Sequence, residues 1–146
     1  QVLHHAGARV RCIGRHTEKL ARLAGRDIET ALLEDCGDLR ASLVVEATGS
    51  AEGFQRAMDA VLPRGTLVLK TTVSERLNLD LSPLVINEIQ VVGSRCGPFT
   101  TALRALETGA VDVTPLIAER VPLSQGLDAL DQAGLRGALK VLIETT

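Results

Sequence analysis

Short runs of aliphatic and β-branched residues alternate along this chain with stretches whose apolar residues recur at helical spacing. The clearest run is Leu43 to Ala47. It is followed by a helical stretch in which Phe54, Ala57 and Met58 share one face, and Ser50 stands where a helix N-cap belongs. Strands that alternate with helices across short polar joints are typical of a parallel sheet covered by helices. The sequence therefore predicts an α/β fold with a doubly wound parallel sheet.

The same alternation assigns elements to the rest of the chain. The segment Gln1 to His5 is expected to end a helix that Gly7 stops. Further strands are expected at Val10 to Ile13, Ile28 to Leu33, Thr66 to Leu69, Ile89 to Val92 and Leu139 to Ile143. One helix is expected from Thr17, as N-cap, to Ala24, and another from Leu123 to Gln132. A helix from Ser50 is expected to run through Val61 and Leu62 and to stop at Pro63 and Gly65. A fourth is expected to have Pro98 as its first residue and to end at a cap at Gly109.

Composition narrows the classes of partner. Sixteen basic and 18 acidic residues give a formal net charge of −2, so no excess of Lys and Arg exists to neutralise nucleic-acid phosphates. No apolar run approaches the roughly 20 residues that span a bilayer, and no secretory signal is recognised. The three cysteines lack the spacing of a zinc site, which fits a reducing compartment. We expect a cytoplasmic protein that binds neither nucleic acid nor membrane.

Ligands of parallel α/β sheets bind beyond the carboxyl ends of the strands. Gly14, Arg15 and His16 directly follow the strand Val10 to Ile13, and Lys19 lies within the next turn. In a dinucleotide-binding fold, an acidic residue at the end of the second strand selects NAD, whereas a nearby Arg accommodates the 2′-phosphate of NADP. Gly14 occupies the acidic position here. A solvated turn with ordinary surface charges explains the same residues about equally well.

Two further strand ends carry candidate ligand contacts. Thr48 and Gly49 offer a hydroxyl and a close backbone approach, although a turn into a capped helix explains them too. Lys70 ends an otherwise apolar strand, and exposure to solvent is an adequate explanation for it. At both places the ligand role is one of two open interpretations.

The segment Gly93 to Pro98 surrounds a polar pair with glycines, which suggests backbone held close to a flat ligand. Within it, Cys96 has no well-placed His to activate it, so packing accounts for it better than nucleophilic catalysis. Lys140 interrupts the last strand and either reaches a pyrophosphate or faces solvent. The chain contains no G-x-G-x-x-G loop, Walker A loop, metalloprotease motif or zinc spacing. The residues alone indicate a nucleotide-binding α/β domain, and they assign no catalytic or metal-ligating residue.

Several segments taken together resemble the zinc-type alcohol dehydrogenases of the medium-chain dehydrogenase/reductase superfamily. They are VVEATGS at 44–50, NEIQVVGSRCG at 87–97, G-x-V-D-V-x-P-L-I at 109–117 and GALKVLI at 137–143. Each is weak alone, but their order and distances match the family over essentially all 146 residues. The resemblance implies an oxidoreductase that transfers hydride between an alcohol or polyol and NADP(H), with NAD as the other candidate, while zinc polarises the substrate oxygen.

The resemblance also implies which residues hold the cofactor phosphates. Arg15, His16 and Lys19 would face the adenosine 2′-phosphate, with Gly14 where NAD-preferring relatives carry Asp. Lys140 would take the position of a basic residue that holds the pyrophosphate.

The remaining candidates would contact the two nucleosides. Thr48 and Gly49 would line the adenine-ribose side, and Lys70 would lie beside the nicotinamide ribose. The backbones of Ser94 and Cys96 would bond the carboxamide.

The resemblance further implies a larger, oligomeric protein. The stretch Leu77 to Val92 resembles the family's dimer interface, so a homo-oligomer is expected. The family's first strand, its glycine-rich loop and its zinc-bearing N-terminal catalytic domain have no counterpart in residues 1–146. We therefore interpret 1–146 as a partial dinucleotide-binding domain that includes the C-terminal helix and strand. In the strand order 3-2-1-4-5-6 the missing strand is central, so we expect this chain not to fold to a native state alone.

Two alternatives stay open. A zinc-free quinone or enoyl reductase of the same superfamily would share this domain, although the segment around Gly93 is of the alcohol type. A non-catalytic nucleotide-binding or dimerisation module would keep the fold without the chemistry. The expected substrate of the leading hypothesis is a small alcohol or carbonyl compound.

Overall fold

The computed structural model describes residues 1–72, 78–135 and 137–145. The chain divides into two compact units. The first unit comprises Gln1–Asp35 and Pro98–Thr146, and the second comprises Cys36–Gly97. None of the described helices is long and apolar enough to cross a membrane.

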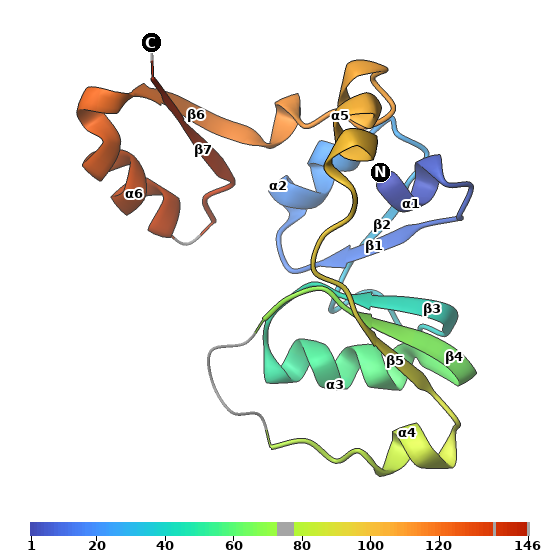
Figure 1. Cartoon of the computed structure of the whole chain (residues 1–146). Helices are drawn as coiled ribbons and strands as arrows, with labels where there is room; N and C mark the ends of the chain where they lie inside the picture. The colour runs from blue at the N-terminus through green and yellow to red at the C-terminus, as the bar shows by residue number, and fades with distance from the viewer. Residues whose placement is uncertain (73–77, 136, 146) are drawn as a thin grey trace. The chain divides into compact units, whose positions relative to one another are not determined.

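The second unit is a parallel sheet with a helix packed against it. Its described strands are β3 (Ala41–Glu46), β4 (Val61–Leu69) and β5 (Gln90–Gly93), which are hydrogen-bonded in the order β3-β4-β5. Helix α3 (Ala51–Ala60) connects β3 to β4 and lies along this sheet in Figure 1, and α4 (Ser82–Ile86) precedes β5.

The core of the second unit forms where α3 meets the middle strand. Phe54, Ala57 and Met58 of α3 are buried and pack with Leu67 of β4, whose side chain has no exposed surface. The apolar helix face expected from the sequence is thus confirmed. Because this core lies against β4, it also positions β3 and β5, the two strands that pair with β4.

The boundary between α3 and β4 differs from the prediction at one end. The N-cap is confirmed, since Ser50 Oγ accepts a hydrogen bond from Gly53 N at 3.0 Å. At the other end, Val61 and Leu62 were expected on the helix, but α3 stops at Ala60 and both belong to β4. Val61 is extended, with φ −79° and ψ 132°. Pro63 explains the early stop, because a proline cannot continue a helix and nearby residues are driven toward extended backbone.

The first unit contains short helices and two small parallel sheets. Its N-terminal part runs through α1 (Val2–His5), β1 (Arg11–Gly14), α2 (Thr17–Leu20), the 3₁₀ turn η1 (Ala21–Leu23) and β2 (Glu29–Leu32). Its C-terminal part runs through α5 (Phe99–Glu107), η2 (Thr114–Leu116), β6 (Ile117–Pro122), η3 (Leu123–Gln125), α6 (Gly126–Gly134) and β7 (Lys140–Glu144). Strand β1 pairs with β2, and β6 pairs with β7.

Three helix starts in the first unit correct the predictions. His16, with extended backbone, is the N-cap of α2, and Thr17 is already helical. Pro98 is likewise the N-cap of α5 rather than its first helical residue, since its ψ is 129°. The helix expected from Leu123 begins as a 3₁₀ turn and becomes α-helical only at Gly126. The fixed φ of proline suits both the N-cap position and the first helical position, so only the value of ψ shows which of the two positions Pro98 occupies.

Strand β6 and the short helix α4 were not predicted. Glu119 and Arg120 interrupt the apolar residues of β6, and both side chains are exposed, so no alternating pattern marks the strand. A partner makes it a strand: Arg120 pairs with Leu142 of β7 in the register, and its guanidinium reaches Glu144 at 3.3 Å.

The described strands pair in parallel throughout, which confirms the predicted α/β class. They form three separate sheets in place of one continuous sheet. Among the described residues, β1 has β2 as its only strand partner and β3 has β4 as its only strand partner.

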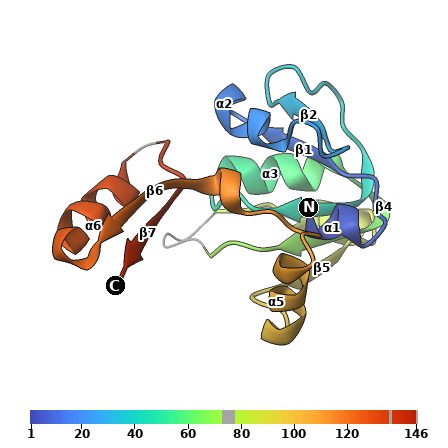
Figure 2. The ribbon, with the colours of Figure 1, turned by 90° about the horizontal axis from the view of Figure 1, so that it is seen from above.

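A polar cluster connects distant segments of the first unit. The Gln1 side chain donates to the Asp112 carbonyl at 2.9 Å and accepts from Asp112 N at 2.8 Å, and Arg26 donates to the Asp112 carboxylate at 2.6 Å. Figure 2 shows the result, with the start of α1 close to the chain that follows α5. These contacts hold together the N-terminal and C-terminal parts of the first unit.

Candidate functional site

The second unit gathers the ends of three parallel strands at one edge. We call this the carboxyl edge and define it by residues 46–49 at the end of β3, 70–71 after β4 and 94–96 after β5. Backbone bonds continue the sheet into it, since Lys70 N donates to Glu46 O and Ser94 N donates to Leu69 O, both at 2.9 Å. Five of the residues singled out in the sequence therefore come from this one region: Thr48, Gly49, Lys70, Ser94 and Cys96.

Glu46 is the buried polar residue of the carboxyl edge, and sequence reasoning missed it. Its side chain is 4% exposed. One carboxylate oxygen accepts from Thr48 N and Thr48 Oγ1, both at 2.6 Å, and from Gly49 N at 3.1 Å. The other oxygen accepts from Thr71 Oγ1 at 2.7 Å. The available signal was a charged residue inside the apolar run Leu43 to Ala47.

These hydrogen bonds decide the charge of Glu46. Burial on its own raises the pKa of the carboxyl, because it disfavours the charged form. The hydrogen bonds from Thr48, Thr71 and Gly49 act in the opposite direction and outweigh burial, so the pKa lies below its ordinary value. The edge consequently contains an ionised carboxylate at neutral pH.

The turn after β3 is held in a defined shape. Thr48 Oγ1 donates to Glu46 and accepts from Ser50 N at 3.2 Å, so the hydroxyl proton is used inside the turn. Gly49 has φ +68°, a conformation that favours glycine, and a Cβ added there would contact Thr71 at 3.7 Å. The close backbone approach at Gly49 stays a prediction, and the Thr48 hydroxyl can offer a ligand only its oxygen.

Gly53→Ala tests how tightly this turn packs on α3. A Cβ at Gly53 would lie 1.8 Å from Thr48 Oγ1, so the Thr48 side chain must move and lose its bond to Glu46. We expect the substitution to lower the free energy of unfolding by about 1–3 kcal/mol, although alanine is the better helix former. Urea denaturation of the full-length protein measures the change.

Gly126→Ala is the matched control, because it also replaces a helical glycine by alanine. Its nearest neighbour to an added Cβ is 3.9 Å away. Helix propensity alone predicts that both variants are at least as stable as the wild type. Equal stability of the two variants would therefore contradict the packing argument.

Lys70 connects the ends of β4 and β5. Its ammonium donates to the Ser94 carbonyl at 3.2 Å and to the Arg95 carbonyl. Both backbone polar groups of Ser94 are thus engaged, since Ser94 N donates to Leu69 O and the Ser94 carbonyl accepts from Lys70. Cys96 is a free cysteine and is exposed, which corrects the expectation of a half-buried packing residue.

The basic residues predicted at the end of the second strand lie together in the first unit. Gly14 ends β1, and a Cβ there would come within 3.1 Å of Leu20, so the backbone is closely packed. Arg15 is exposed, and His16 Nδ1 lies 3.6 Å from the carboxylate of the exposed Glu18. Lys19 is half-buried on α2. Cationic side chains thus follow the end of β1, and position 14 itself carries no carboxylate.

Lys140 is not part of either group. It is exposed and begins β7, so it lies at the amino end of its strand, opposite to the end where ligands of parallel sheets bind.

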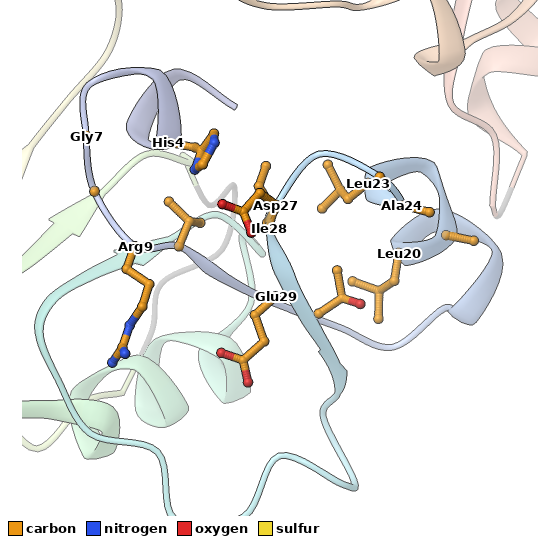
Figure 3. A pocket seen from close by; sticks show the side chains of 14 residues that line it. His4, Gly7, Arg9, Leu20, Leu23, Ala24, Asp27, Ile28 and Glu29 are labelled. Carbon is orange, nitrogen blue, oxygen red and sulfur yellow. The ribbon is translucent and has the colours of Figure 1, made fainter.

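A hollow of about 760 Å³ lies elsewhere in the first unit. Figure 3 shows it with His4, Gly7 and Arg9 on one side and Leu20, Leu23 and Ala24 on the other. None of the predicted site residues is among the described residues that line it. The described part of the chain also contains no group of three or more His, Cys, Asp or Glu side chains that could hold a metal ion.

Comparison with known proteins decides the family. The family model described as zinc-binding dehydrogenase matches residues 1–110. The chain belongs to the zinc-binding dehydrogenase family. This confirms the resemblance to zinc-type alcohol dehydrogenases.

Curated relatives of this zinc-binding dehydrogenase chain are longer proteins. Mouse (Mus musculus) sorbitol dehydrogenase is 30% identical over 104 residues, which cover 70% of this chain and 29% of the relative. The uncharacterised zinc-type alcohol dehydrogenase-like protein YdjL of Escherichia coli (strain K12) is 25% identical over 120 residues, 80% of this chain and 34% of the relative. The chain thus spans about a third or less of these relatives.

Solved structures confirm the fold of this dehydrogenase chain. A short chain alcohol dehydrogenase from E. coli CFT073, complexed with NADH, aligns with a TM-score of 0.84 at 18% identity over 99% of this chain and 47% of that one. A zinc-binding dehydrogenase from Sinorhizobium meliloti 1021, bound to NADP, aligns with a TM-score of 0.82 at 22% identity over the same shares. At these identities the likeness establishes the Rossmann-like α/β fold.

Proposed function

We propose that the protein transfers hydride between an alcohol or polyol and NADP(H), and that this chain supplies part of the cofactor-binding domain. Family membership and relatives such as sorbitol dehydrogenase support the reaction class. The nicotinamide supplies the hydride acceptor or donor when the cofactor is bound. In this proposal the described residues of this chain bind and orient that cofactor.

The observation that carries the cofactor preference is the end of β1. Gly14, the last residue of β1, has no side chain to accept a hydrogen bond from a ribose 2′-hydroxyl. A Cβ at this position would come within 3.1 Å of Leu20, so a side chain there would be crowded. Arg15 and Lys19 provide positive charge nearby, and a guanidinium can donate to two phosphate oxygens at once. Glu18 faces His16, so His16 is the weakest of the proposed phosphate contacts. A 2′-phosphate fits this set of donors better than a hydroxyl.

The carboxyl edge of the second unit is proposed to meet the nucleosides. It offers the backbone at Gly49, the carbonyl of Ser94 and the backbone of Cys96, which suit ribose hydroxyls and an amide. Lys70 acts there by holding the Ser94 and Arg95 carbonyls. Lys140 stays a proposed pyrophosphate contact.

The proposal extends to the rest of the full-length protein. A separate catalytic domain would carry the zinc ligands. The greater length of the relatives supports this, since the chain covers 29% of mouse sorbitol dehydrogenase. We accordingly interpret residues 1–146 as part of one dinucleotide-binding domain.

Self-association and location complete the proposal. A homo-oligomer is proposed through the stretch Leu77 to Val92, of which Leu77 lies outside the described residues. The exposure of Val91 and Val92 on β5 supports a partner there. Among the described residues, Cys12 and Cys96 are free cysteines, which supports a reducing compartment such as the cytoplasm.

Steady-state kinetics of the full-length protein test this function. A panel of polyols and secondary alcohols is oxidised with NADP⁺ or NAD⁺, with and without a metal chelator. We expect kcat/KM to be at least about tenfold higher with NADP⁺ and to fall after chelation. Chelator-resistant reduction of quinones or enoyl compounds would instead indicate the zinc-free reductase. Binding of neither nucleotide would overturn the proposal.

A further inference from the structure

One carboxylate joins two of the strand ends at the carboxyl edge. Glu46 belongs to β3, and its side chain bonds both to the turn that follows β3 and to Thr71, which follows β4. Thr71 is 25 residues from Glu46 in the chain. The contact therefore fixes the two loops relative to each other beyond the last bonds of the sheet.

The arrangement at Glu46 is costly for a residue that serves only to fill the core. Burying a charge is unfavourable unless every lone pair is well satisfied, and an apolar side chain of similar size fills such a place with less penalty. Here both carboxylate oxygens are satisfied by donors from the two loops. What a carboxylate adds over a leucine is a defined direction for each of these donors.

The same bonds decide what the turn can offer a ligand. The N–H groups of Thr48 and Gly49 point at Glu46, which occupies the place of an anion in this turn. They are thus not available to a phosphate. The turn meets a ligand through its outward backbone and through the glycine at position 49, and their position depends on Glu46.

We propose that Glu46 is a positioning residue for the cofactor, which through Thr71 holds the Thr48–Gly49 turn in register with the loop after β4. The inference rests on the proposed function, because it assumes that the nucleotide meets this edge. Thr71 is a positioning residue as well, because it donates the hydrogen bond to Glu46. Neither residue needs to touch the cofactor.

Thr71 provides the sharper test, because Glu46→Gln removes the charge from a buried site and can prevent folding. Thr71→Val keeps the shape of the side chain but removes the donor to Glu46, and Thr71→Ser keeps the hydroxyl. Thr72→Val is the matched control, since Thr72 is the next residue and is exposed. The dissociation constant of NADPH is measured by fluorescence titration of the full-length protein, together with the midpoint of thermal unfolding.

We expect Thr71→Val to raise the Kd of NADPH about tenfold, and Thr71→Ser and Thr72→Val to stay within about twofold of the wild type. Glu46→Gln, where it folds, should raise Kd at least as much. A merely structural role would lower the unfolding midpoint of Thr71→Val but leave its Kd unchanged, and this result overturns the proposal. So does a Thr71→Ser variant as weak as Thr71→Val, because the hydroxyl would then be irrelevant.

The wild-type titration separates this proposal from the one it rests on. Wild-type protein that binds NADPH normally while the Thr71 variants do not differ refutes only the role of Glu46. Wild-type protein that binds neither NADPH nor NADH refutes the proposed function, and the positioning role falls with it.

Discussion

Arg15→Asp in the full-length protein is expected to raise the Kd of NADPH about 100-fold and to leave the Kd of NADH within about threefold. The wild-type guanidinium can form two charge-assisted bonds to a 2′-phosphate, and the aspartate both removes these bonds and repels the phosphate. The adenosine of NADH carries a 2′-hydroxyl instead, and a carboxylate near Gly14 can accept a hydrogen bond from it. Fluorescence titration with both cofactors measures the two constants.

Arg22→Asp controls for the change in charge. Arg22 lies on η1 in the same unit, is exposed, and undergoes the same substitution. A general electrostatic effect would weaken NADPH binding in both variants by similar factors. Equal losses of NADPH and NADH affinity in Arg15→Asp would defeat the assignment of Arg15 to the 2′-phosphate.

Leu67→Ala is expected to lower the free energy of unfolding by about 2–5 kcal/mol, the range for removing a buried leucine side chain. Leu67 has no exposed surface and packs with Phe54, Ala57 and Met58. Partly buried apolar residues such as Val44, Leu84 and Ile89 also pack against this core. Urea denaturation of the full-length protein, followed by circular dichroism, measures the loss.

Leu62→Ala is the control on the same strand. Leu62 belongs to β4 but is 40% exposed, so its truncation leaves no closed cavity. We expect a loss of less than about 1 kcal/mol for it. A similarly small loss for Leu67→Ala would show that α3 does not pack on β4 as described.

The predicted and observed structures agree best where the signal is local. Ser50 is an N-cap because its side chain bonds to Gly53 three residues on, and Gly109 has the positive φ expected after a helix. They differ where a pattern continues across a boundary. Val61 extends the apolar face of α3 by spacing, but the strand pairing of β4 and the nearby Pro63 place it in the sheet.

The candidate site divides in the same way. The cations at 15 and 19 and the missing acid at 14 stand close together in the sequence and could be found there. Glu46 could not be assigned a role, because one of its partners, Thr71, is far away in the chain. The contact of Lys70 with Ser94 likewise depends on which residues of β4 and β5 face each other.

Patterns in the sequence predict the α/β class, the strand ends that carry polar residues and the resemblance to a dehydrogenase family. These follow from short-range patterns, since helix caps, apolar spacing and turn residues act within a few positions. The contact of Glu46 with a second strand end and that of Lys70 with a third depend instead on how the chain folds. Parallel strands are neighbours in the sheet without being adjacent in the chain. The register of β3, β4 and β5 therefore involves residues far apart in the sequence, as does the packing of Leu67 against α3.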